Sequence, residues 1–132
     1  MARRTDINLR LRVDFGAAAS VGPGKIALLE HIERQASLSQ AARELGMSYR
    51  RAWQLMTDLN RSFSQAVATA STGGFGGGGA SLTPFGRKLV KTYRALERQA
   101  TASARRKFSR VATVTDPAAR PKRMRLSRRP KS

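Results

Sequence analysis

The chain has 132 residues with 26 Lys and Arg against 8 Asp and Glu, a formal net charge of +18. This length suits one compact domain, and the excess of positive charge favours an anionic partner, either nucleic acid or a membrane surface. The absence of cysteine excludes disulfides and thiolate metal sites, and without an apolar run of about 18 residues or a signal-peptide pattern at the N-terminus we expect a cytoplasmic protein.

Apolar and polar residues alternate near the N-terminus, over residues 7–15. The apolar set is Ile7, Leu9, Leu11, Val13 and Phe15. Alternation over this length predicts a half-buried strand. Residues 16–24 are mostly small and contain the sequence Val-Gly-Pro-Gly, so they are predicted to form a loop.

A first helix is predicted from Pro23 or Gly24 to Gln35, because proline suits the first helical position. Its apolar stripe consists of Ile26, Leu29, Ile32 and Ala36, widened by Leu28. Glu30, Glu33 and Arg34 are expected in solvent, as is His31, the only histidine, which has no metal-ligand spacing to Asp or Cys.

A second helix should follow at once and be short. Ser37 and Gln40 have the spacing of a capping box, and Gly46 is placed to end the helix in the left-handed conformation. Ser48 can then cap a third helix that runs from Tyr49 to about Phe63.

The third helix has two chemically different faces when residues are advanced by about 100° each. The inner face carries Ala52, Leu55, Met56, Leu59 and Phe63, and the outer face carries Arg50, Gln54, Thr57 and Arg61. Tyr49 and Trp53 flank the inner face, so we expect Trp53 to pack into the core.

Residues 67–83 are predicted to form two short strands around a glycine-rich tip, a wing. Thr83 and Pro84 then begin a fourth helix that should end near Ala100. Residues 101–132 carry 11 Lys and Arg but one acid, Asp116. We therefore divide the chain into a folded domain, 1–100, and a disordered basic tail, 101–132.

A short helix, a three-residue turn and a helix with a polar outer face predict a winged helix-turn-helix in a mainly α fold. The second of these helices would read double-stranded DNA, with Arg50 donating to guanine and Gln54 to adenine or phosphate. The candidate DNA contacts are Ser37, Ser39, Gln40, Ser48, Tyr49, Arg50, Arg51, Gln54, Thr57, Arg61, Gly76 and Gly77.

Three segments, residues 22–29, 39–53 and 76–83, closely resemble the N-terminal domain of ModE-type molybdate-responsive transcription regulators, which is related to the LysR winged helix. The resemblance covers about residues 7–100. It implies a homodimer that binds an inverted-repeat operator, with a link to molybdenum metabolism. The dimer contacts that it implies lie on the first and last helices, at Ile26, Leu29, Phe85, Leu89, Tyr93 and Leu96.

Two features depart from this family. Its full-length members carry two C-terminal molybdate-binding modules, whereas about 32 residues follow the last predicted helix here, so we expect no molybdate or other cofactor. Phe75 stands at the wing tip where relatives often have a basic residue, and residues 62–86 contain no Lys or Arg. We therefore expect the wing to approach phosphates through backbone amides.

Other function classes have weaker support. The glycine run at 73–79 lacks the Gly-Lys-Ser/Thr ending of a phosphate-binding loop, and no residues have the pattern of a catalytic triad, so we expect neither an enzyme nor a small-molecule substrate. The charge leaves open a nucleoid-associated protein of low sequence preference, and more weakly a tail bound to anionic lipid. Phosphate contact by the tail is the favoured interpretation.

Overall fold

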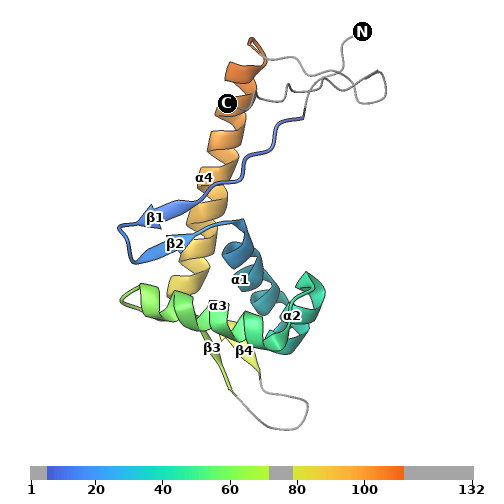
Figure 1. The fold of residues 1–132 in the computed structure, drawn as a ribbon, viewed down its shortest axis with the longest axis vertical. Helices are drawn as coiled ribbons and strands as arrows, with labels where there is room; N and C mark the ends of the chain where they lie inside the picture. The colour runs from blue at the N-terminus through green and yellow to red at the C-terminus, as the bar shows by residue number, and fades with distance from the viewer. Residues whose placement is uncertain (1–5, 72–78, 112–132) are drawn as a thin grey trace, which may run out of the picture.

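The computed structural model describes residues 6–71 and 79–111, which contain four helices and two small antiparallel hairpins. Helices α1 (Pro23–Gln35), α2 (Leu38–Leu45) and α3 (Tyr49–Ser62) form a compact bundle. Strands β3 (Ala68–Ala70) and β4 (Ala80–Leu82) project from one end of it, and α4 (Pro84–Phe108) begins beside their base and extends past the bundle in the opposite direction (Figure 1). This confirms the expected mainly α fold with a hairpin wing.

The core is centred on α1, whose four large apolar residues are completely buried: Ile26, Leu28, Leu29 and Ile32. Helix α3 adds Ala52, Met56 and Leu59 from one side, all of which are buried. Each fully buried Leu or Ile contributes about 1.5–3 kcal/mol relative to an exposed one. The apolar periodicity of the two helices therefore explains why they pack with these faces together.

The predicted N-terminal strand is wrong in its extent. Only β1 (Val13–Phe15) pairs, with β2 (Ala19–Val21), in a segment that was expected to be loop. Gly16, with a φ of 66°, permits the tight return between the two strands. Residues 6–12 run beside α4 instead (Figure 1), where the Tyr93 hydroxyl donates to the Leu11 carbonyl at 2.8 Å. Their burial still alternates, because one side faces α4.

Two helix ends also differ from expectation. Ala36 does not continue the apolar stripe of α1 but ends the helix in the left-handed conformation, with a φ of 54° and an exposed side chain. Helix α4 runs to Phe108 rather than to Ala100. Between these residues no Gly or Pro interrupts the helix, and three cations in its last turn oppose the negative end of the helix dipole.

Candidate nucleic-acid interface

Helices α2 and α3 are each capped at their N-terminus by a serine hydroxyl. The Ser37 hydroxyl accepts from the Gln40 N–H at 3.1 Å, and the Ser48 hydroxyl accepts from the Arg51 N–H at 3.0 Å. Gly46 between them has a φ of 69°, which glycine adopts without strain. The predicted caps and the three-residue turn are confirmed, and they set the angle at which α3 leaves the bundle.

The inner and outer faces of α3 are as the sequence predicts. The buried side chains of Ala52, Met56 and Leu59 hold one side of the helix against the core. Arg50, Gln54 and Arg61 are exposed on the other side, and Thr57 is half-buried beside them. A helix attached in this way presents donors and acceptors to solvent on a rigid support.

Trp53 was expected in the core, and this is wrong. Its side chain is 39% exposed, and Tyr49, one turn before it, is 50% exposed. Trp53 lies about 100° around the helix from the buried Ala52. At that position its side chain lies outside the surface of α3 that packs in the core. Sequence reasoning missed this residue because an aromatic side chain at the border of an apolar face is usually buried.

The wing is attached to α3 through Asn60. The Asn60 amide oxygen accepts from the N–H groups of Val67 and Ala68 at 2.7 and 3.2 Å, and the amide nitrogen donates to the Ala68 carbonyl at 3.0 Å. From the other side, the Thr83 N–H donates to the Val67 carbonyl at 3.0 Å. The positions of wing and α3 are therefore coupled by short, direct bonds. No sequence signal identified Asn60.

The other predicted DNA contacts fall at the edges of this surface. Ser39, Gln40, Ser48 and Arg51 are exposed, whereas Ser37 is half-buried and its hydroxyl caps α2. Gly76 and Gly77, at the predicted wing tip, lie outside the described residues, as does Phe75. The described candidates on α2 and α3 are therefore exposed, apart from the half-buried Ser37 and Thr57.

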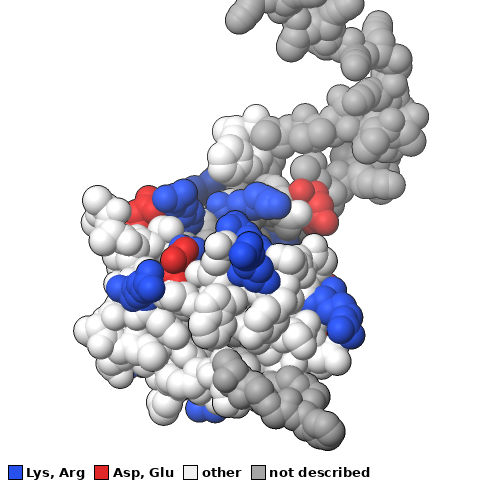
Figure 2. Space-filling model, turned by 60° about the horizontal axis from the view of Figure 1, so that its bottom comes forward, with Lys and Arg blue, Asp and Glu red and all other residues white. Residues whose placement is uncertain are grey.

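On this face Lys and Arg outnumber Asp and Glu. Figure 2 shows Lys and Arg side chains spread over the end of the molecule that carries α3 and the wing, with few acidic side chains among them. On α3, Arg50, Arg51 and Arg61 are exposed together with one acid, Asp58. A surface of this composition attracts a polyanion.

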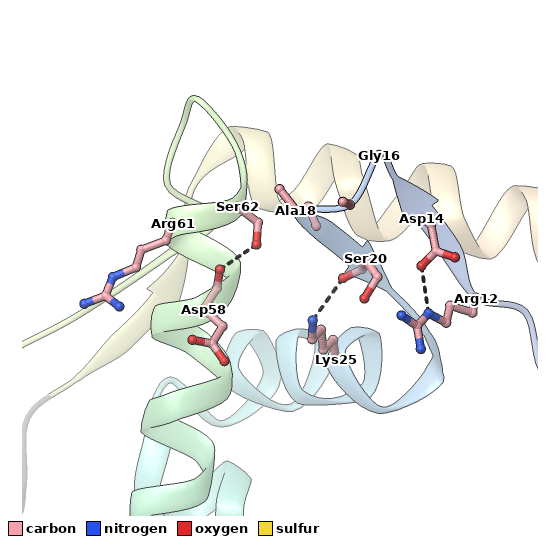
Figure 3. A pocket seen from close by; sticks show the side chains of 11 residues that line it. Arg12, Asp14, Gly16, Ala18, Ser20, Lys25, Asp58, Arg61 and Ser62 are labelled. Atoms are coloured by element: carbon pink, nitrogen blue, oxygen red, sulfur yellow. Dashed lines mark hydrogen bonds and ion pairs between the residues drawn. The ribbon is translucent and has the colours of Figure 1, made fainter.

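Two shallow hollows, each of about 490 Å³, flank α3 and share Asp58 and Arg61. One lies along the outer face of α3 beside Arg50, Trp53 and Gln54. The other lies between α3 and the β1–β2 hairpin (Figure 3). The second hollow therefore contains charges of both signs, Arg12, Lys25 and Arg61 together with Asp14 and Asp58.

In the second hollow the charges are partly paired. Arg12 Nε donates to Asp14 at 2.7 Å, and Lys25 Nζ donates to the Ser20 carbonyl at 3.0 Å. Figure 3 shows Asp58 on the α3 side of the hollow and Arg61 extending away from the hairpin. This arrangement leaves Arg61 directed towards the outer face of α3.

The six residues expected at a dimer contact divide into three groups by burial. Ile26, Leu29 and Tyr93 are buried within the single chain. Phe85 and Leu89 are half-buried, and the Phe85 ring packs edge-on against Phe63 at 5.6 Å. Leu96 is 42% exposed. Phe108 and Val111, at the far end of α4, are also exposed and were not predicted.

Helix α4 is tied to α1 by two ion pairs. Glu33 is exposed, as the sequence suggested, whereas Glu30 is half-buried. Arg94 donates to both carboxylate oxygens of Glu30 at 2.7 and 2.9 Å and to Glu97 at 2.6 Å. Arg87 donates to Glu33 at 2.9 Å. The pairs set the direction of α4 relative to the bundle.

The ionisable groups at this contact are shifted in consistent directions. The hydrogen bond from Arg94 lowers the pKa of Glu30, and burial opposes this only in part. The same bond raises the pKa of Arg94. Burial raises the pKa of Tyr93, and the Glu97 charge adds to that effect. The shifts of Glu30 and Arg94 both favour the charged forms that pair α4 with α1 at neutral pH.

Both ring nitrogens of His31 have a partner. Its Nε2 lies 3.5 Å from a Glu44 carboxylate oxygen, and its Nδ1 lies 2.9 Å from the Ala27 carbonyl oxygen. Within residues 6–71 and 79–111, no group of three or more His, Cys, Asp and Glu is placed to hold a metal ion. In the same part of the chain no helix is long and apolar enough to cross a membrane.

The residues that form the helix-turn-helix and the wing strands match a known protein family. Residues 24–87 match the family of bacterial regulatory helix-turn-helix proteins, lysR family. These residues form a LysR-type helix-turn-helix domain. The match begins at the start of α1 and ends in the first turn of α4, so it includes the turn, α3 and the wing strands. The LysR-type domain is a regulatory module and not an enzyme, in agreement with the expectation from the sequence.

The LysR-type domain is homologous to the N-terminal part of ModE and Mop proteins, which confirms the resemblance described above. The chain is 47% identical over 79 residues to the molybdenum-pterin-binding protein MopB of Rhodobacter capsulatus, covering 60% of this chain and 29% of MopB. It is 34% identical over 106 residues to the molybdenum transport protein ModE of Azotobacter vinelandii, covering 80% and 39%.

A third relative is the DNA-binding transcriptional dual regulator ModE of Escherichia coli K12, 41% identical over 71 residues, which are 54% of this chain and 27% of that protein. The chain thus spans about a third of the length of the curated relatives that it matches. The similarity therefore leaves about two thirds of each of those proteins unmatched.

Proposed function

We propose that this chain is a sequence-specific DNA-binding transcription regulator whose α3 enters the major groove. The proposal depends on the two different faces of α3. Ala52, Met56 and Leu59 lie in the core, whereas Arg50 and Gln54 are exposed. Arginine donates two parallel hydrogen bonds to guanine, and glutamine forms a similar pair with adenine. The basic surface around α3 supplies the attraction to phosphate.

The proposal is tested by changing Arg50 and Gln54 to alanine together. The duplex is one that the full chain selects from a random library, and binding is measured by competition against unselected duplex. We expect the unaltered protein to prefer the selected duplex by about 10³-fold or more. Each lost bidentate pair should reduce that preference by roughly five- to 100-fold, with the melting temperature unchanged.

Matched control substitutions are Arg98→Ala with Gln99→Ala, the same two residue types exposed on α4. These should leave the preference intact. If the Arg50 and Gln54 double variant stays folded and keeps its full preference, α3 does not read the sequence.

The regulator is proposed to act as a homodimer that joins through the exposed part of α4. Leu96 and Phe108 place apolar surface on the half of α4 that stands away from the bundle (Figure 1), and Val111 adds to it just beyond the helix end. Two copies related by a two-fold axis would carry two α3 helices to an inverted repeat, with half-sites one or more turns of DNA apart. Sedimentation velocity should give a dimer at micromolar concentration and a monomer for Leu96→Glu. Arg98→Glu, on the opposite side of α4, should remain dimeric.

A second candidate function is a nucleoid-associated protein of low sequence preference. The net charge of +18 favours it, because non-specific affinity comes from phosphate neutralisation. The same competition measurement separates the two functions. A preference below about tenfold would favour the nucleoid protein over the regulator. In either function the protein acts on the bacterial chromosome, in the cytoplasm.

The names of the relatives connect two of them with molybdenum binding or transport. We propose that the genes regulated here belong to molybdenum metabolism. Genome-wide mapping of the bound sites tests this directly. Sites scattered without regard to molybdenum-related genes would contradict the link and leave the DNA-binding proposal standing.

A further inference from the structure

Two aromatic side chains lie exposed on the helix that we propose to be the reading helix. Tyr49 and Trp53 are one turn apart on α3, with half and two fifths of their side chains exposed. Trp53 lines the hollow on the outer face of α3 together with Arg50, Arg51, Gln54 and Thr57. Aromatic surface in water is unfavourable unless a partner covers it.

The aromatic pair lies in line with Asn60, the α3 residue bonded to the wing base. Residues spaced by three and four lie in one row along a helix, which places Tyr49, Trp53, Thr57 and Asn60 in line. Asn60, at the end of that row, is bonded to Val67 and Ala68 at the base of the wing. Tyr49 and Trp53 therefore lie on the same side of α3 as Asn60, the residue bonded to the wing base.

The charges around the pair indicate what covers it. Arg50, Arg51 and Arg61 line the same hollow as Trp53, and Asp58 is the acid among them. A second copy of this chain would bring the same cations against these, because its own exposed α3 is equally basic. A polyanion that also carries apolar groups satisfies both features.

Duplex DNA has these properties, since its major groove exposes the C5-methyl group of thymine as an apolar feature within a polyanionic wall. We propose that Trp53, with Tyr49 beside it, contacts thymine methyl groups on the wing side of the major groove and so selects thymine at those positions. This rests on the proposed function and adds apolar readout to the polar readout by Arg50 and Gln54.

The first test removes only the methyl group. In the duplex selected by the full chain, each thymine is replaced in turn by deoxyuridine, and binding is measured by fluorescence anisotropy. Burial of one methyl group corresponds to about a fourfold difference in affinity. We expect at least one thymine in each half-site to show a loss of this size.

Variants connect that loss to Trp53. Trp53→Ala should bind thymine and deoxyuridine duplexes equally, whereas Trp53→Phe, which keeps an apolar ring, should retain the difference. Arg50→Ala is the control, because it should weaken binding to both duplexes and leave their ratio unchanged. Methyl removal requires no variant, so the proposal remains testable if Trp53→Ala fails to fold.

The second test uses the fact that Trp53 is the only tryptophan in the chain. Its emission should shift to shorter wavelength, and its quenching by acrylamide should fall, when the selected duplex is added. If the chain selects a duplex but deoxyuridine has no effect at any position, or if Trp53 stays fully quenchable, the methyl contact is excluded while DNA reading by α3 stands. If no duplex is selected over random DNA, both proposals fail.

Discussion

The peptide group of Val67 is held on both sides, with its N–H donating to Asn60 Oδ1 at 2.7 Å and its carbonyl accepting from Thr83 N–H at 3.0 Å. One bond comes from the end of α3 and the other from the N-cap of α4. The wing therefore begins at a point where both helices meet. Any movement of the wing relative to α3 must break these bonds.

Asn60→Ala should lower the free energy of unfolding by about 1–3 kcal/mol, because two backbone N–H groups and the Ala68 carbonyl lose their partner. Urea denaturation followed by circular dichroism measures this. Asn8→Ala, an exposed asparagine, is the matched control and should change stability by less than about 0.5 kcal/mol. Equal stability of the two variants would mean that the wing base does not depend on Asn60.

Gly86→Ala should destabilise the protein by about 1–3 kcal/mol or more. A Cβ atom at Gly86, in the first turn of α4, would overlap the backbone carbonyl of Val67, and backbone cannot move aside as a flexible side chain can. Gly24→Ala is the control, since a Cβ there meets open space in the first turn of α1. It should be neutral or slightly stabilising. Thermal denaturation of both variants gives the comparison.

The Glu30–Arg94 pair should make stability depend on pH on the acid side. The pKa of Glu30 is lowered in the folded protein, so its contribution is complete above its usual value of 4.5 and is lost as pH falls through the folded-state pKa. Glu30→Gln should therefore cost about 1 kcal/mol at pH 7 and progressively less below pH 4.5. Glu33→Gln, at the more exposed pair with Arg87, should cost less than about 0.5 kcal/mol. A cost for Glu30→Gln that is independent of pH would contradict this account.

Removal of residues 112–132 should flatten the salt dependence of DNA binding. This segment carries seven Lys and Arg and one acid, Asp116, and lies outside the described residues. Each phosphate contact that is lost lowers the slope of log affinity against log salt by about 0.9. Sequence preference should stay unchanged, because α3 is intact. A slope equal to that of the full chain would exclude phosphate contact by the tail.

Local signals in the sequence were enough to predict α1, α2, α3 and the wing. Ser37, Gly46, Ser48, Thr83 and Pro84 act through hydrogen bonds or backbone conformations within three or four residues, so their effect does not depend on the rest of the fold. The inner and outer faces of α3 follow from helical periodicity alone for the same reason. Those features place Arg50 and Gln54 on the exposed side.

The surroundings of Trp53 and Glu30 and the pairing of residues 7–12 were decided by tertiary structure. A strand requires a partner that sequence alternation does not supply, and here residues 7–12 lie against α4 instead. Trp53 is exposed because α1 contacts a narrower arc of α3 than its apolar residues span, and Glu30 is bonded because α4 crosses α1 at Arg94. Each of these three features depends on which helix lies nearby. The contacts join residues far apart in the chain, and the periodicity of one segment does not reveal such contacts.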